Sequence, residues 1–282
     1  MRCGGGAHAS SPHRQEENSQ CVWIYLSSKD VGNCPKQRRI IMELQKEMKR
    51  VAEWIVSEVK SRHKDGVVIG LSGGIDSSVS AALGVLGLGV NRVLGLIMPC
   101  RSQTEDQEDA KFVASNIGIE THTVDLNVAY EAMVAASPVE LDGNTRSRLR
   151  MAMLYGVASK MNRLVLGTTN YPEYMVGYFT KWGDGAVDLE PLMMFKKHEV
   201  FEIGRLLGLP ECIQKRVPTA GYFPGQTDEG EMGISYDRLD NALTCVRDGF
   251  HLNSVSHDEL VRAIRLIAAS NHKREDIPFF HR

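Results

Sequence analysis

The chain has 282 residues, which is enough for one α/β domain of ordinary to large size or for two small domains. Its 33 Lys and Arg residues nearly balance its 35 Asp and Glu residues, so its charge argues against a nucleic-acid partner and favours a small-molecule substrate. No apolar run approaches the length of a membrane span and the first residues lack a signal-peptide core, so we expect no membrane association.

Residues 1–38 differ from the rest of the chain. Residues 1–20 are rich in Gly, Ser, His and Glu without periodicity, and such a segment cannot bury enough surface to offset its ordering entropy. We therefore expect a disordered extension over 1–38 and a single folded domain over 39–282. The cysteines and histidines of the extension match no zinc-finger spacing. The whole chain contains no C-x-x-C pair, which indicates reduced thiols in a cytoplasmic protein.

Regular structure is expected from Ile40 onward. Apolar residues recur at intervals of three and four, which predicts a long helix with one apolar face, used for core packing: Ile40, Ile41, Leu44, Met48, Val51, Ile55 and Val59. Strands are then expected at 67–71, 92–98, 121–126 and 163–167, and helices at 76–86, 104–117 and 144–161. This alternation predicts an α/β fold with a doubly wound parallel sheet flanked by helices, which binds ligands at the carboxyl ends of its strands. Beyond Pro172, two Gly- and Pro-rich loops at 177–191 and 217–233 precede the last helices.

The turn after the first strand reads Ser72-Gly73-Gly74-Ile75-Asp76-Ser77-Ser78. Glycines without Cβ let a phosphate lie against bare amides, the serines add hydroxyl donors, and a helix N-terminus favours an anion. Asp76 would repel phosphates unless a divalent cation lay between them, which implies Mg²⁺. The turn is neither a Walker A loop nor G-x-G-x-x-G, but it satisfies the G-x-S-x-G pattern of a nucleophile elbow. We expect it to hold the phosphate chain of ATP.

The string SGGIDSS resembles the pyrophosphate-binding loop of the ATP pyrophosphatases, which adenylate an oxygen of their substrate. Later stretches narrow this resemblance: G-T-T-N-Y-P-E at 167–173, G-Y-F-T-K-W-G-D-G-A-V-D at 177–188 and P-T-A-G-Y-F-P-G-Q-T-D-E-G-E-M-G-I-S-Y at 218–236. With segments 144–151 and 272–274, they make the chain similar to the ammonia-dependent NAD synthetases from about Ile40 to Pro278.

The resemblance implies a carbon–nitrogen ligase with the adenine nucleotide alpha hydrolase-like fold of the ATP pyrophosphatase type. Its reaction would amidate deamido-NAD with ammonia through an adenylated intermediate and release AMP and pyrophosphate, as the last step of NAD biosynthesis. A homodimer with the substrate site at the interface is also implied, and the apolar face beginning at Ile40 is compatible with it. Glutamine-using relatives carry an additional amidase domain, for which this chain has neither the length nor a suitable segment, so we expect free ammonia or ammonia from a separate protein.

The resemblance also assigns site residues, position by position. ATP is expected at Gly70, Leu71, Ser72, Gly73, Gly74, Ile75, Asp76, Ser77, Thr168, Lys197 and Thr219. Mg²⁺ is expected at Asp76 and Glu173, and deamido-NAD at Arg148, Lys181, Asp188, His272 and Lys273. Catalytic roles fall to Asp76, Glu173, Lys197 and Asp184, with Lys197 and Mg²⁺ neutralising the β and γ phosphates. Some bacterial members carry an Arg near the end of the second strand, where this chain has Leu96-Ile97-Met98-Pro99.

Two other functions compete with this assignment. A serine hydrolase would use Ser72, Asp188 and His272, which follow the chain order of the α/β-hydrolases. It would leave Asp76, Glu173, Lys181 and Lys197 without roles, and no H-G-G-G stretch supplies an oxyanion hole. A non-catalytic nucleotide-binding module of similar fold would bind ATP without releasing pyrophosphate.

Overall fold

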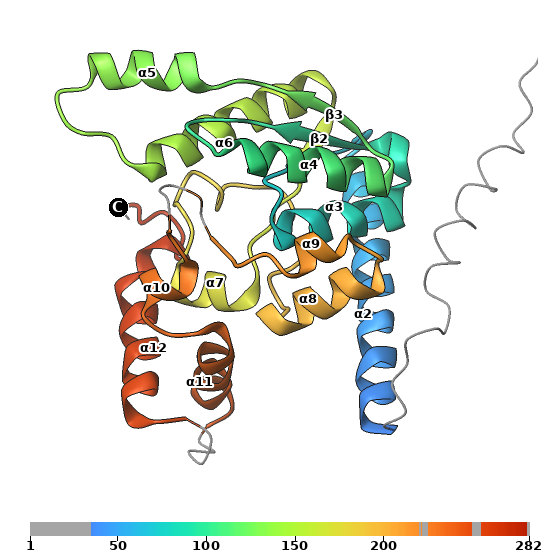
Figure 1. The fold of residues 1–282 in the computed structure, drawn as a ribbon, viewed down its shortest axis with the longest axis vertical. Helices are drawn as coiled ribbons and strands as arrows, with labels where there is room; N and C mark the ends of the chain where they lie inside the picture. The colour runs from blue at the N-terminus through green and yellow to red at the C-terminus, as the bar shows by residue number, and fades with distance from the viewer. Residues whose placement is uncertain (1–34, 220, 222–224, 250–254, 281–282) are drawn as a thin grey trace, which may run out of the picture.

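The computed structural model describes residues 35–219, 221, 225–249 and 255–280 (Figure 1). Its sheet has the strand order β3-β2-β1-β4, and every pairing is parallel. The strands are β1 (Gly66–Gly70), β2 (Val93–Ile97), β3 (Glu120–Thr123) and β4 (Arg163–Val165). The chain runs outward from β1 to β3 and then returns to place β4 on the other side of β1. The carboxyl ends of β1 and β4 therefore form the topological switch point at which such folds bind ligands.

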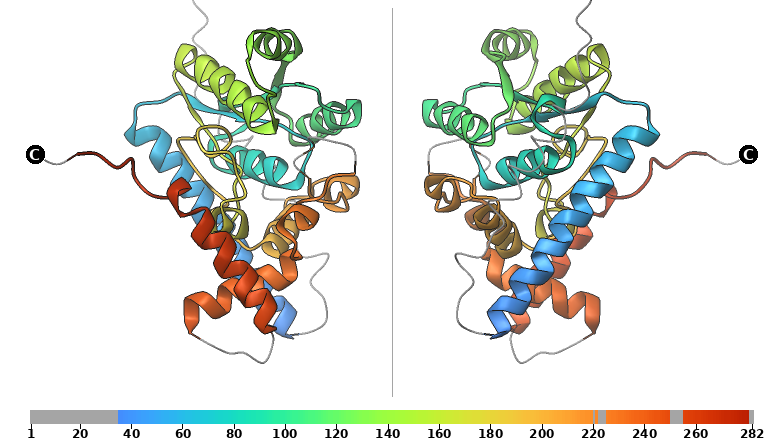
Figure 2. Two further views of the ribbon diagram at one scale, coloured as in Figure 1. Left: turned by 90° about the vertical axis from the view of Figure 1, so that its left-hand side faces the viewer. Right: turned by 90° about the vertical axis from the view of Figure 1, so that its right-hand side faces the viewer.

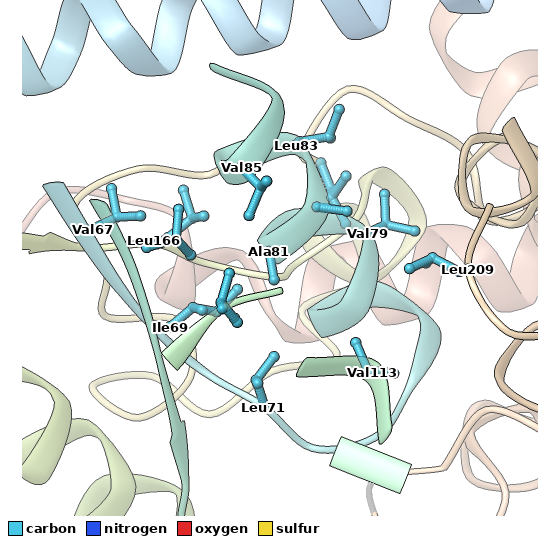
Figure 3. Close-up of a cluster of buried hydrophobic side chains, with 14 of the residues drawn as sticks. Val67, Ile69, Leu71, Val79, Ala81, Leu83, Val85, Val113, Leu166 and Leu209 are labelled. Atoms are coloured by element: carbon cyan, nitrogen blue, oxygen red, sulfur yellow. The ribbon is translucent and has the colours of Figure 1, made fainter. Parts of the chain in front are cut away.

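Helices cover both faces of the sheet because alternate strand residues point to opposite sides. Val67, Ile69 and Leu71 enter one core, shown in Figure 3, while Val68 enters the other. The first core is covered by α2 (Pro35–Ser61), α3 (Ile75–Leu88), α4 (Thr104–Ile117) and α8 (Lys197–Leu206), and the second by α5 (Asn127–Ala136) and α6 (Gly143–Lys160). The predicted doubly wound α/β fold is confirmed.

A second group of helices lies at the end of the molecule away from the sheet (Figures 1 and 2). It consists of α7 (Tyr171–Val176), α10 (Asp228–Met232), α11 (Tyr236–Asp248) and α12 (His257–Ala269). Leu239, Ala242 and Ala263 are fully buried in its own apolar core. The short helix α9 (Glu211–Gln214) and the 3-10 turns η3 (Val90–Arg92) and η5 (Asn271–Lys273) complete the described elements.

The long first helix begins earlier than predicted, and its apolar face packs in the core as predicted. It begins at Pro35, so residues 35–38, which the prediction placed in the extension, are helical; residues 1–34 lie outside the described part of the chain. Its buried face packs against α3 and α8 of the same chain, although Ile40 itself is 52% exposed. Core packing of this face is therefore confirmed.

Other elements agree with the sequence prediction to different degrees. The helix expected at 104–117 is found with those bounds, while the strand expected at 121–126 ends at Thr123. The sequence prediction missed α5 and α7, and α10 lies inside the loop expected at 217–233. None of the described helices combines the length and apolarity needed to cross a membrane.

Candidate active site

The turn 72–74 joins β1 to the start of α3, as predicted, but its two glycines serve different purposes. Gly73 is buried with a positive φ of 78°, and an added Cβ would lie 2.7 Å from the backbone oxygen of Asp106 in α4. Gly74 is the N-cap of α3 and makes no side-chain capping bond. Gly73 therefore permits the close approach of α4, whereas Gly74 leaves the N-terminus of α3 open toward a cavity.

Serine hydroxyls organise this turn from within. The amide of Ser72 donates to Ser77 Oγ over 3.3 Å, and the amide of Gly74 donates to Ser72 Oγ over 3.2 Å. Ser78 Oγ donates to the Gly74 carbonyl oxygen over 2.7 Å. The Ser72 and Gly74 amides and the Ser78 hydroxyl are therefore hydrogen-bonded within the turn, and these bonds hold its shape.

Asp76 and Glu173 come together around one buried lysine. Lys197 Nζ lies 2.6 Å from Asp76 Oδ2 and 3.0 Å from Glu173 Oε1, and the lysine side chain is only 2% exposed. Asn170 links the same two carboxylates, because its Nδ2 donates to Asp76 Oδ1 over 2.8 Å and its backbone amide donates to Glu173 Oε2 over 3.3 Å. Asn170 and Glu173 form a capping box at the start of α7, so a local helix signal fixes Glu173 in the site.

Two residues outside the predicted set extend this network. Tyr236 OH lies 3.0 Å from Glu173 Oε1 and 2.9 Å from Asp228 Oδ2, so one hydroxyl proton serves two carboxylates. Tyr178 OH donates toward Asp228 Oδ1 over 3.1 Å and also contacts Glu231. The α10 helix thus supplies two further acidic side chains beside the predicted pair.

Burial controls the protonation of these groups. It raises the pKa of Glu173 to about 7, an effect opposed by Lys197 and reinforced by Asp76 and Asp228. For Lys197, burial lowers the pKa, but the adjacent Asp76 and Glu173 carboxylates more than compensate, so its pKa lies above the ordinary value. Burial also raises the pKa of Asp228. Lys197 therefore stays charged at neutral pH, whereas Glu173 titrates near neutral pH.

A cavity of about 310 Å³ lies at the switch point of the sheet. Most of the predicted ATP residues line it: Gly70, Leu71, Ser72, Gly74, Ile75, Asp76, Ser77, Thr168 and Thr219. Glu173 and Asp184 line it as well. Gly73 and Lys197 do not, because Gly73 packs on α4 and Lys197 lies behind the two carboxylates. The sequence analysis overlooked the two arginines of this cavity, Arg150 and Arg216.

A second cavity adjoins the first, and Val187 lines both. Of the residues expected to bind deamido-NAD, Asp188 and Lys273 line it, whereas Arg148, Lys181 and His272 line neither cavity. Lys273 Nζ donates to the carbonyl oxygens of Gly177 and Phe179, each over 2.7 Å. Asp188 Oδ2 accepts from the Val165 amide over 2.8 Å, which holds the loop 177–191 against β4.

Arg148, Lys181 and His272 are joined to one another through backbone oxygens. Arg148 Nη2 donates to the Lys181 carbonyl oxygen over 3.3 Å, and Lys181 Nζ donates to the His272 carbonyl oxygen. Asp184 anchors the same loop, since its Oδ1 accepts from Ser147 Oγ over 2.6 Å and from the Thr180 amide over 3.0 Å. Arg148, Lys181 and His272 are thus one hydrogen-bonded group outside the cavity linings, whereas Asp184 lines the first cavity.

Glu190 is an acidic residue of the second cavity that the sequence analysis did not identify. Its carboxyl group lies against Gly167, where an added Cβ would be 2.4 Å away, and its Oε2 accepts from the Thr169 amide over 3.1 Å. Burial raises the pKa of Glu190 to about 8. The wall between the cavities thus contains a carboxyl group that is largely protonated at neutral pH.

Comparisons with known proteins identify the family of the chain. The NAD synthase family profile matches residues 47–277. The chain belongs to the NAD synthase family. Its relatives include an NH3-dependent NAD(+) synthetase of Methanosarcina acetivorans, which is 41% identical over 84% of this chain and 98% of the relative.

Two solved structures of the family superpose on most of the chain. The NMN synthetase of Francisella tularensis is 38% identical with a TM-score of 0.77, over 84% of this chain and 98% of that one. The NH3-dependent NAD synthetase of Campylobacter jejuni is 26% identical with a TM-score of 0.73, and the match covers 84% of this chain and 99% of that one. The chain therefore has the fold of these two enzymes, a parallel sheet flanked by helices.

Proposed function

We propose that this chain amidates deamido-NAD with ammonia, consuming ATP and producing NAD⁺, AMP and pyrophosphate. The observation that carries the proposal is the meeting of Asp76 and Glu173 at a cavity lined by the glycine turn and by Thr168 and Thr219. Identity of about 40% to NH3-dependent NAD(+) synthetases over most of the chain supports the substrate assignment. A serine hydrolase is disfavoured, because Ser72 lines the first cavity while Asp188 is bound to β4 and lines the second.

Mg²⁺ fits the acidic side chains of this site. Asp76, Glu173, Asp228 and Glu231 form one network around the Lys197 ammonium, so carboxylates outnumber the cation within it. Within the described ranges no three His, Cys, Asp or Glu residues are arranged to hold a metal, so protein ligands alone would not complete a site. Mg²⁺ commonly uses one or two carboxylates together with substrate phosphates. We infer that Asp76 and Glu173 hold it, where it would screen phosphate charge.

The chain's own residues would align the two substrates. The open N-terminus of α3, with Ser72 and Ser77, would bind the β and γ phosphates, and Thr168 and Thr219 would contact the same nucleotide. Lys197 is proposed to hold Asp76 and Glu173 in position, since it faces them and not the cavity. Arg148, Lys181, Asp188, His272 and Lys273 would bind deamido-NAD around the second cavity, with Asp184 holding their loop against α6.

The chemistry follows from this alignment. A nicotinate carboxylate oxygen bonds to the α-phosphorus of ATP while the bond from that phosphorus to the bridging oxygen breaks, and pyrophosphate leaves. Ammonia then bonds to the activated carbonyl carbon, loses a proton and displaces AMP. No enzyme nucleophile takes part, so positioning and electrostatic stabilisation supply the rate enhancement.

A homodimer and a cytoplasmic location complete the proposal. Exposed apolar side chains on and next to α5, namely Val128 (81% exposed), Met133 (42%) and Val139 (68%), give a surface that a second copy could cover. The described cysteines Cys100, Cys212 and Cys245 form no disulfide, which is compatible with a reducing compartment.

The direct test is incubation with ATP, Mg²⁺, ammonium and deamido-NAD, followed by measurement of NAD⁺ and pyrophosphate. We expect equal yields of the two products, and loss of activity by a factor of at least about 100 in Asp76→Asn and Glu173→Gln. Glu108→Gln, which alters an exposed carboxylate on α4, is the matched control and should keep full activity. Pyrophosphate release without NAD⁺ would refute the assignment, as would near-normal turnover in either site variant.

A second candidate substrate is nicotinate mononucleotide. The Francisella NMN synthetase is more similar to this chain than the Campylobacter NAD synthetase, in both identity and TM-score. The two substrates share the carboxylate that is amidated and differ in the adenylate half. Comparison of kcat/KM for deamido-NAD and nicotinate mononucleotide decides between them, and we expect deamido-NAD to be preferred.

A further inference from the structure

Arg216 lies beside the glycine turn and is held from two sides. Its Nη1 donates to Asp109 Oδ2 over 2.7 Å, and its Nη2 donates to Asp106 Oδ1, both on α4. Nη1 also lies 3.5 Å from the carbonyl oxygen of Gly73. These contacts fix the guanidinium against the turn before any ligand arrives.

The fixed guanidinium still has donors to offer. An arginine carries five N–H groups, and among the described residues the acceptors of Arg216 are Asp106, Asp109 and the Gly73 carbonyl. Its side chain is 24% exposed and lines the first cavity together with Ser72 and Thr219. Two N–H groups thus remain on a planar group whose rotamer is already set, which favours bidentate binding of an oxyanion.

Acidic side chains outnumber cationic ones in the lining of the first cavity, so its few cations matter for binding an anion. Five carboxylates line the first cavity, those of Asp76, Asp106, Glu173, Asp184 and Asp228, against two cationic side chains. One of the two, Arg150, lies at the end of β2, where it donates to the Met98 carbonyl oxygen and to Ser102 Oγ. Arg216 is the lining cation beside the glycine turn. A polyphosphate bound at the turn would therefore meet it first.

The geometry points to Arg216 as a binding residue for the pyrophosphate end of the nucleotide. It would donate to oxygens of the β and γ phosphates and stabilise the charge that the leaving pyrophosphate gains when its bond to the α-phosphorus breaks. This inference rests on the proposed function for the identity of the leaving group. It deepens that function by naming the cation that the serine and glycine turn lacks.

A purely structural role for Arg216 makes a different prediction. If the arginine only tethers residues 216–219 to α4, then loss of its aspartate partners should weaken pyrophosphate binding as much as loss of the arginine. If it binds phosphate, the variant D106N/D109N keeps the guanidinium and removes two negative charges near the ligand. Binding should then be as tight as in the wild type, or tighter.

Calorimetric titration of the full chain with magnesium pyrophosphate separates the two roles. We expect the Kd to rise about tenfold to a hundredfold in Arg216→Met, and less in Arg216→Lys, which keeps a charge but loses the planar donor pair. Lys215→Ala is the matched control, because this neighbouring cation is exposed and pairs with Glu211; its Kd should stay within about twofold of wild type.

Several results would overturn the inference. One is a Kd in Arg216→Met within about twofold of wild type, and another is a loss of affinity in D106N/D109N equal to that in Arg216→Met. Circular dichroism checks that each variant is folded; if Arg216→Met is not, the aspartate double variant decides the question. An enzyme that forms NAD⁺ but shows no Arg216 dependence refutes this inference alone. Pyrophosphate binding that depends on Arg216 without NAD⁺ formation refutes the proposed function alone.

Discussion

Replacement of Lys197 by Met tests the electrostatic design of the site. The side chain is 2% exposed and its ammonium contacts Asp76 and Glu173, so Met fills the space but leaves both carboxylates without their cation. Breaking a buried pair in this way costs about 3–5 kcal/mol. Asp76 is 20% exposed and keeps some hydration, which favours the lower end, about 3 kcal/mol. For a domain of this size, that loss corresponds to a fall in Tm of about 6–12 °C.

The loss should depend on pH in a definite direction. Lys197 has a folded pKa above its ordinary value, so its contribution is fully present at neutral pH and is lost only in strong alkali. Without the ammonium, the pKa of Glu173 rises beyond about 7, because Lys197 is what lowers it. At pH 5 the carboxyl group of the variant is then neutral and tolerates burial. The deficit should therefore be largest near pH 8 and smaller at pH 5.

Urea denaturation followed by circular dichroism, with EDTA present, measures this deficit at both pH values. Lys196→Met is the matched control, since Lys196 Nζ contacts the Thr244 hydroxyl over 2.9 Å and its loss should cost about 1 kcal/mol or less. A deficit below about 1 kcal/mol at pH 8 would refute the reasoning. An equal deficit at pH 5 and pH 8 would show that packing and not charge is responsible.

Two further variants probe the carboxyl groups and their support. Burial raises the pKa of Glu190 in the folded state from 4.5 to about 8, so the free energy of unfolding should fall as pH rises between these values. The variant Glu190→Gln should lack this pH dependence and be more stable than the wild type at pH 7, by up to roughly 3 kcal/mol. Urea titrations at pH 5 and pH 8 check this, and a wild type without such a slope would contradict it. Asn170→Ala removes the cap of α7 and the hydrogen bond to Asp76, so it should cost about 1–2 kcal/mol and raise the Mg²⁺ concentration needed for half-maximal activity. An unchanged Mg²⁺ requirement would remove Asn170 from the proposed metal site.

The sheet and its main helices were predictable because their signals are local. A buried parallel strand is a short apolar run, and an amphipathic helix repeats every three or four residues, as at 104–117. Helix α5 gives no such periodic signal, because Tyr130 is the one residue of this helix that is buried. Helix α7 has only six residues, but Asn170 and Glu173 form a capping-box pattern that could have revealed it.

The site was predictable in its residue types but not in its contacts. The family resemblance implied that Asp76 and Glu173 share a site, and the structure brings them together because β1 and β4 are neighbouring strands. Lys197 is 121 positions from Asp76, and Tyr236 is 63 positions from Glu173, so these contacts depend on how helices α8 and α11 pack. Packing of α8 places the Lys197 ammonium against these two carboxylates, and its expected role in neutralising the phosphates stays a prediction.

The distribution of charge along the chain explains why one short motif does not define the enzyme. The turn 72–78 supplies amides, hydroxyls and one carboxylate but no cation. The cations come from the second half of the sequence: Lys197 holds the acidic pair, and Arg216 reaches the turn from the segment after α9. A loop that attracts phosphate thus becomes a site of adenylyl transfer only when distant segments fold against it. Substitutions at 197 and 216 should consequently impair different properties, the placement of the carboxylates in one case and the affinity for pyrophosphate in the other.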